Sequence, residues 1–219
     1  MGIEWVDTLG KRRTSMTKYI TRTQLNKYLK AMAILDTVMV AEDEDWLRLV
    51  SVETMDNGYQ YIIDNGSGDT VNVIFHEAGT IIKGFDHENE LNQFAADEWN
   101  DEFFTSTYEG VPDEIMDLLD EDAYENMTFC MWCTDETDEW IQNETEDDDG
   151  GREYLLGYIR QNAEDWCEWA SDYYDVELDE SIVEKVYKGE ELSEEDILKL
   201  NSEADIKSVL KQMEEIKKC

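Results

Sequence analysis

Two histidines, each beside acidic residues, are the first candidates for metal binding or acid–base chemistry. His76 precedes Glu77, and His87 lies between Asp86 and Glu88. Because both flank a strand-like segment, one hypothesis brings His76, Asp86 and His87 together around a metal ion. The alternative is that both are strand-end histidines held by local carboxylates. The zinc-protease pattern HExxH is absent, and the sequence predicts no bound metal and no other cofactor.

Cys130 and Cys133 form a CxxC pair, a spacing found in redox-active and zinc-binding sites. Residues three apart on a strand point to opposite faces, so the two thiols would not converge. No second CxxC and no pair of histidines follows to complete a zinc site. We interpret both as inert strand cysteines. With Cys167 and Cys219, the cysteines are few and unevenly spaced, which fits a reducing compartment better than a disulfide framework.

The segment 64–69, Asp-Asn-Gly-Ser-Gly-Asp, has the composition of a calcium loop but not its spacing. Counting Asp64 as the first ligand places Gly66 third and Phe75 twelfth, where an EF-hand needs an oxygen ligand and a glutamate. We therefore interpret this segment as a hairpin turn. Nucleophile-elbow, Walker and dinucleotide-binding patterns are also absent, and carboxylates are too frequent for any pair to stand out. The sequence predicts a protein that is not an enzyme.

Short runs of β-branched and aromatic residues alternate with turn signals between residues 46 and 85. Asn-Gly between apolar runs is the strongest short-range hairpin signal. The pattern predicts a four-stranded antiparallel meander, with strands at 47–53, 59–63, 71–75 and 80–85. Residues 127–134 are expected to form a further strand, for which 139–143 is a candidate partner.

Apolar residues at three- and four-residue spacing predict a helix from about Thr23 to Met39 and several more after residue 152. Ser193 and Asp196 have the spacing of a capping box. Strands grouped before helices indicate an α+β fold, an antiparallel β-meander with an N-terminal helix and a C-terminal helical region. We expect three parts: a basic arm at 1–20, an α+β domain with the sheet at 21–145, and a helical region packed on it at 146–219.

Acidic side chains dominate the middle of the chain. The 219 residues include 55 Asp and Glu against 18 Lys and Arg, a formal charge of −37. Residues 41–180 hold 42 of these acids and four bases, a charge of −38, whereas the first 40 residues carry +4 and the last 39 carry −3. Aromatic residues (11%) are interleaved with the acids, which argues for a folded protein with an acidic surface and against disorder.

A field of this size repels nucleic acid and anionic membranes and attracts basic surfaces. The sequence therefore predicts a non-catalytic acidic binding protein that engages and inhibits a basic nucleic-acid-handling protein. A nucleic-acid mimic, an immunity protein, an antitoxin or a phage anti-defence protein would fit. We expect the partner to meet the densest acidic runs: Asp135, Glu136, Asp138, Glu139, Glu144, Glu146, Asp147, Asp148, Asp149, Glu164, Asp165, Glu168 and Asp172.

Two alternatives stay open. One is an acidic cytoplasmic adaptor or housekeeping protein whose charge serves only solvation, without mimicry. The other is a metal-dependent enzyme that uses His76, Asp86 and His87. No apolar run approaches the roughly 20 residues that span a bilayer, and the N-terminus lacks the apolar segment of a signal peptide. We therefore expect a cytoplasmic protein that binds neither membrane nor nucleic acid directly.

The segments 75–79 (FHEAG), 83–88 (KGFDHE), 108–112 (YEGVP) and 128–132 (TFCMW) resemble a family of uncharacterised acidic bacterial cytoplasmic proteins. The region around 165–200 is also similar to that family, while the basic arm lies outside the resemblance. The motifs carry no assigned chemistry. The resemblance thus implies a bacterial or phage origin and no catalytic residue.

Overall fold

The computed structural model describes residues 5–6, 12–13, 20–119, 124–137, 139–143 and 148–219. Most of the expected basic arm lies outside these residues. Two short strands within it, β1 (Trp5–Val6) and β2 (Arg12–Arg13), pair antiparallel. Among the helices of the described ranges, none is long and apolar enough to cross a membrane.

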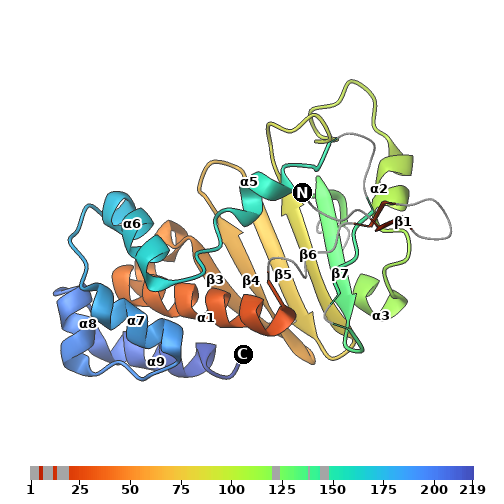
Figure 1. Ribbon diagram of the computed structural model, residues 1–219. Helices are drawn as coiled ribbons and strands as arrows, with labels where there is room; N and C mark the ends of the chain where they lie inside the picture. Colours follow the sequence, from red (N-terminus) through yellow and green to blue (C-terminus); the bar gives the residue numbers. More distant parts are fainter. Residues whose placement is uncertain (1–4, 7–11, 14–19, 120–123, 138, 144–147) are drawn as a thin grey trace. The chain divides into compact units, whose positions relative to one another are not determined.

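The main sheet has five strands in the order in which they occur along the chain. They are β3 (Val50–Met55), β4 (Gly58–Asp64), β5 (Thr70–His76), β6 (Gly79–Phe85) and β7 (Phe129–Thr134). Figure 1 shows these strands side by side in one antiparallel sheet. The predicted meander and the additional strand are confirmed, and with them the α+β class.

The turn between β3 and β4 forms where the Asn-Gly signal predicts it, but of these two residues only Asn57 takes the positive φ that a type I′ turn needs at both. Asn57 has φ +61°, which asparagine tolerates better than most residues. A Cβ on Gly58 would lie 2.3 Å from the carbonyl oxygen of Phe75 on the neighbouring strand, so only glycine fits there. In the next turn, Asp64 and Asn65 accept hydrogen bonds from backbone amides two residues ahead, both at 2.8 Å, as side chains do in tight turns.

Eight α-helices and one 3₁₀ helix are described. They are α1 (Arg22–Met39), η2 (Glu42–Leu47), α2 (Asp101–Thr107), α3 (Asp113–Met116), α5 (Arg152–Leu156), α6 (Ala163–Tyr174), α7 (Glu180–Lys188), α8 (Glu194–Leu200) and α9 (Ile206–Ile216). The predicted capping box of Ser193 and Asp196 opens α8. Helix α9 begins at Ile206, where Asp205 caps it by accepting from the amides of Lys207 and Ser208.

The chain divides into two compact units that are interleaved along the sequence. The sheet unit comprises residues 1–22 and 54–157, and the helical unit comprises 23–53 and 158–219. Each unit therefore draws on both halves of the chain, unlike the consecutive ranges expected from composition.

The core of the sheet unit lies between the sheet and helices α2 and α3. Ile74, Ile81, Cys130 and Trp132 from the strands pack with helix residues such as Phe104. Each of these side chains is at most 3% exposed. This face of the sheet is thus covered by elements that the sequence places after β6.

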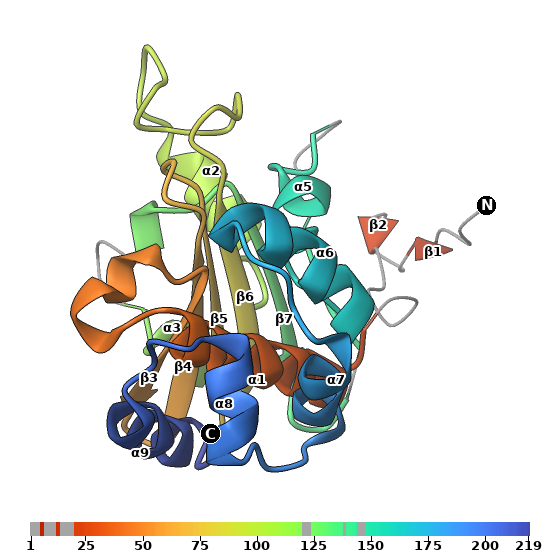
Figure 2. The ribbon, with the colours of Figure 1, turned by 90° about the vertical axis from the view of Figure 1, so that its left-hand side faces the viewer.

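The core of the helical unit forms around α1. Leu25, Leu29, Met32 and Leu35 of this helix are fully buried. Figures 1 and 2 show α1 lying alongside α7, α8 and α9. Asn201, which follows α8, donates its side-chain amide to the carbonyls of Val38 and Met39 at the end of α1.

Candidate functional site

A histidine and a buried aspartate meet at one end of the sheet. Asp69 precedes β5 and His87 follows β6. Because Thr70 is paired with Phe85 in the antiparallel ladder, the residues just outside these strands reach the same sheet end. The pairing brings together two residues that are 18 positions apart in sequence.

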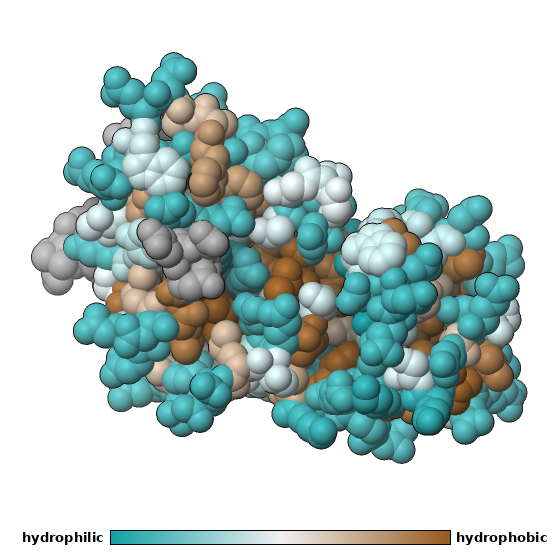
Figure 3. Space-filling model, turned by 180° about the vertical axis from the view of Figure 1, so that it is seen from behind, coloured by the Kyte–Doolittle hydropathy of each residue, from teal (hydrophilic) through white to brown (hydrophobic). Residues whose placement is uncertain are grey.

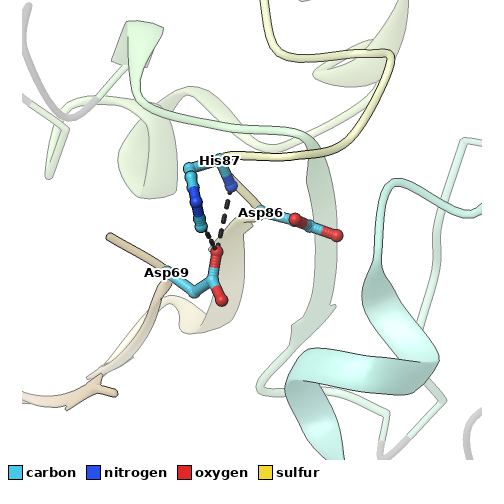
Figure 4. Close-up of side chains that lie close together, drawn as sticks. All are labelled: Asp69, Asp86 and His87. Atoms are coloured by element: carbon cyan, nitrogen blue, oxygen red, sulfur yellow. Dashed lines mark hydrogen bonds and ion pairs between the residues drawn. The ribbon is translucent and has the colours of Figure 1, made fainter. Parts of the chain in front are cut away.

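The carboxylate of Asp69, with a relative exposure of 4%, is the centre of this cluster. Its Oδ1 accepts a hydrogen bond from the backbone amide of His87 at 3.0 Å and lies 2.7 Å from the imidazole Nδ1, as Figure 4 shows. Its Oδ2 accepts from Asn65 at 2.7 Å and from the hydroxyl of Tyr154 at 3.1 Å. The Asp69 clasp, as we call these four residues, therefore ties the β4–β5 turn, the end of β6 and helix α5 together.

Electrostatics favours the charged form of both partners. Burial alone would raise the pKa of Asp69, but hydrogen bonds from His87, Asn65 and Tyr154 outweigh burial and hold the pKa below its usual range. The pKa of His87 is raised, chiefly by its hydrogen bond to Asp69. The imidazole is 42% exposed and thus exchanges protons with solvent.

Asp86 adds a third potential metal ligand. One ligand atom each of Asp69, Asp86 and His87 lies within 4.8 Å of the others. Two ligands of one tetrahedral ion, each about 2.1 Å from it, are about 3.4 Å apart, whereas Asp69 Oδ1 and His87 Nδ1 are at hydrogen-bonding distance. Figure 4 shows the Asp86 carboxylate turned away from the other two side chains. A cation held by Asp69 Oδ1 and His87 Nδ1 would have to displace the proton between them, and Asp86 would have to reorient to join it. The observed geometry is that of a hydrogen-bonded clasp.

His76 does not join this cluster, contrary to the hypothesis that it shares an ion with His87. The two histidines lie at opposite ends of β6, whose seven residues span roughly 20 Å. His76 instead stabilises its own turn, where its Nδ1 accepts from the amide of Ala78 at 3.1 Å and its carbonyl accepts from Arg22 at 2.8 Å. Sequence reasoning chose the wrong partner because adjacency along the chain does not show which strand ends coincide. The register of β5 and β6 does show which ends coincide, and it places Asp69 beside His87.

Both CxxC cysteines are reduced thiols buried in β7. Cys130 lies opposite Lys83 and Cys133 opposite Thr80 in the ladder. Burial raises the pKa of Cys130 and so disfavours its reactive thiolate form. This environment agrees with the interpretation of strand cysteines without redox or metal chemistry.

The predicted partner-binding acids divide between the two units. In the sheet unit, Asp135, Glu136, Glu139 and Asp148 are exposed and Asp149 is half-buried. In the helical unit, all four predicted acids of α6 are exposed: Glu164, Asp165, Glu168 and Asp172. The remaining four lie outside the described residues: Asp138, Glu144, Glu146 and Asp147.

Several of these acids already have structural partners. Asp135 forms an ion pair with Arg22 at 2.6 Å. Asp149 accepts from the amides of Gly151 and Glu153 at the start of α5, and Asp148 accepts from the amide of Gly150. Glu136 and Glu139 have no such contact within the described chain, which leaves them free to meet a partner.

The distribution of cations distinguishes the two units more than the distribution of acids. The sheet unit contains 31 acids and seven bases, a charge of −24, against 24 acids and 11 bases in the helical unit. Five of the seven bases lie in residues 1–22, so residues 54–157 hold 29 acids and two bases, a charge of −27. Both bases are shielded: Lys83 is 2% exposed and donates to the carbonyl of Asn126, and Arg152 bonds to Gln142 with its side chain 19% exposed. Figure 3 shows hydrophilic side chains over much of the face that it presents.

The helical unit contains 24 acids and 11 bases, so its charge is partly compensated. Lys188 pairs with Glu184, and Lys199 with Glu195, each at 2.8 Å and one helical turn apart. Such exposed pairs stabilise a helix weakly but neutralise the local field. The uncompensated charge of the protein therefore resides mainly in the sheet unit.

Sequence reasoning missed one feature of that surface, an exposed aromatic pair. Phe94 and Trp99 lie in the segment between β6 and α2, with relative exposures of 59% and 43%. The segment has no periodicity that would have predicted their positions. The only signal was two large aromatic residues within a polar, acidic stretch.

No family model, curated protein or solved structure matches this chain. The resemblance of its motifs to acidic bacterial proteins stays a prediction.

Proposed function

We propose that the protein is a non-catalytic acidic binding protein that engages and inhibits a basic nucleic-acid-handling partner in the manner of a nucleic-acid mimic. Immunity proteins, antitoxins and phage anti-defence proteins are the functional classes that fit. One observation carries the proposal: residues 54–157 combine 29 acids with two shielded bases. A basic groove that holds a polyanion would bind this surface, because carboxylates fixed on a fold can occupy the positions of phosphates.

Folded elements hold these carboxylates in place, which supports mimicry over simple solvation. Asp113 and Glu114 open helix α3, and Glu136 lies two residues after strand β7. A fixed array loses less conformational freedom on binding than a flexible acidic tail would. Attraction between exposed charges is screened over about 10 Å at 0.1 M salt, so the complex should weaken steeply as salt rises.

The test is capture on the immobilised full chain from a nuclease-treated bacterial lysate, with the retained proteins identified by mass spectrometry. We expect basic nucleic-acid-binding proteins that are released by salt and by competing double-stranded DNA. A purified captured protein should then lose its nucleic acid when this chain is added. The proposal would be refuted if the immobilised chain retained no basic protein, or if the retained proteins were not released by salt.

A matched pair of double variants separates mimicry from general acidity. Glu136→Gln with Glu139→Gln neutralises exposed acids of the sheet unit, and Glu194→Gln with Glu203→Gln removes the same charge from the helical unit. We expect the first pair to weaken inhibition more than the second. Equal effects would favour the alternative of an acidic adaptor or housekeeping protein without mimicry.

A further inference from the structure

The exposed rings of Phe94 and Trp99 lie side by side on the sheet unit. Their centroids are 5.6 Å apart with an interplanar angle of 69°. Large aromatic side chains are costly to leave in water, and tryptophan is enriched among the residues that dominate binding energies at protein interfaces. The pair is therefore a candidate anchor for a partner.

The core supports both rings from below. Trp99 stacks on Phe104 at 5.1 Å and 29°, and Phe104 is only 2% exposed. Phe94 meets Phe85, at the end of β6, edge to face at 6.0 Å. The rings are thus fixed against the sheet unit before any partner arrives.

The segment that carries the rings is held by its own hydrogen bonds. Asn92, 6% exposed, donates to the carbonyl of His87 at 2.7 Å and accepts from the amide of Phe94 at 3.0 Å. The side chain of Gln93 accepts from the amide of Asn100 at 3.1 Å. Such preorganisation lowers the entropic cost of binding.

Acidic side chains predominate in the segment around the rings, with the partly exposed His87 as the exception. The same segment and the first turn of α2 expose six carboxylates: Glu88, Glu90, Asp97, Glu98, Asp101 and Glu102. From residue 84 to residue 151 the chain contains 24 acids and neither Lys nor Arg. An occupant of this surface must therefore be cationic as well as able to contact aromatic faces.

Arginine meets both requirements better than lysine. Its planar guanidinium stacks on aromatic rings and binds carboxylates through two parallel hydrogen bonds. The ammonium of lysine is a strongly hydrated point charge that loses more on desolvation. Trp99 already donates its indole N–H to Asp101 at 2.9 Å, so its remaining binding capacity is that of the ring.

We propose that Phe94, Trp99 and the carboxylates around them are the docking site for an arginine-rich segment of a protein partner. The inference rests on the proposed function, because it names the part of the acidic surface that makes the first specific contact. It also specifies the chemistry of the partner, which net charge alone does not.

The test uses two synthetic peptides of equal length and charge, one with arginine and one with lysine as its only cation. Calorimetric titration of the full chain at low salt should give tighter binding for the arginine peptide. Phe94→Ser and, separately, Trp99→Leu should each weaken binding of the arginine peptide about tenfold and remove the preference over lysine. Substitution of Phe94 perturbs folding less than substitution of Trp99, because the side chain of Phe94 is more than half exposed.

Trp46→Leu is the matched control. Trp46 is 70% exposed and follows four consecutive acids in the helical unit, yet no ring of the described residues packs against it. This variant should leave the affinity unchanged. If both peptides bound equally, with an affinity that depends on salt but not on Phe94→Ser or Trp99→Leu, the docking site would be overturned. The charge-based function would still stand. Binding of neither peptide at low salt would overturn the proposed function itself.

Discussion

Replacing Asp36 by asparagine tests the interior of the helical unit. This carboxyl group is fully buried in α1. Its Oδ2 accepts from the amide of Val50 at 2.8 Å and its Oδ1 from the hydroxyl of Tyr174 at 3.0 Å. Burial raises the pKa of Asp36 to about 7, although these hydrogen bonds and the charge of Arg48 oppose the rise.

The pKa sets the direction of the pH dependence. A rise from 3.8 to about 7 corresponds to about 4 kcal/mol of unfolding free energy. Above pH 7 the group is charged in both states, and the folded state bears the whole cost. Between pH 7 and pH 4 the folded state holds a proton that the unfolded state lacks, so the cost shrinks as pH falls. Asparagine cannot ionise, so the unfolding free energy of Asp36→Asn should exceed that of the wild type by up to about 4 kcal/mol near pH 8. Near pH 4 the two unfolding free energies should match.

The assay is urea unfolding of both proteins across this pH range, with amide hydrogen exchange in α1 as the probe of the helical unit. Asp43→Asn is the control, because it removes the same charge from an exposed position of the same unit. It corrects for the general relief of repulsion in a chain of charge −37. If Asp36→Asn were less stable than the control near pH 8, or if the two pH profiles ran parallel, the reasoning would be refuted.

Three further predictions concern single contacts. Asp69→Asn should destabilise the sheet unit most between about pH 4 and 6.5, which unfolding midpoints measured against pH would check. The pKa of Asp69 is lowered in the folded state, so its contribution to stability is lost as pH falls. The pKa of His87 is raised, so its contribution is lost as pH rises. Gly84→Ala should cost about 1 to 3 kcal/mol by denaturant unfolding, since a Cβ there would lie 2.0 Å from the buried ring of Phe129. Ser193→Ala should cost about 1 kcal/mol through loss of the capping box and raise exchange rates in α8, whereas Ser202→Ala, outside any cap, should not.

The elements were predictable where local chemistry decides them. Asn57 and Gly58 specify a turn because the first tolerates a positive φ and the second fits where a Cβ would clash. The β-branched and aromatic residues of 71–75 and the apolar spacing in α1 similarly identify a strand and a helix. Exact helix boundaries depend on individual capping residues, as at α9, where the side chain of Asp205 fixes the first turn.

The candidate sites were less predictable, because they depend on which strand ends and loops meet. Sequence adjacency suggested His76 as the partner of His87, but the register of β5 and β6 supplies Asp69 instead. The exposed pair of Phe94 and Trp99 was missed because exposure of an aromatic side chain depends on what packs over it. Phe104, only a few residues farther along, is buried.

The sequence by itself determined the α+β class, the meander and the regional acidity, since each follows from local turn chemistry, side-chain periodicity or composition. Only the tertiary structure decided that α1 shares a unit with α6 to α9, and that both bases of residues 54–157 are shielded while most of the described acids there are exposed. The physical reason is that burial and cross-strand pairing are set by contacts between residues distant in sequence. Net charge can be counted along a chain, but which charges face solvent is decided by what the fold covers.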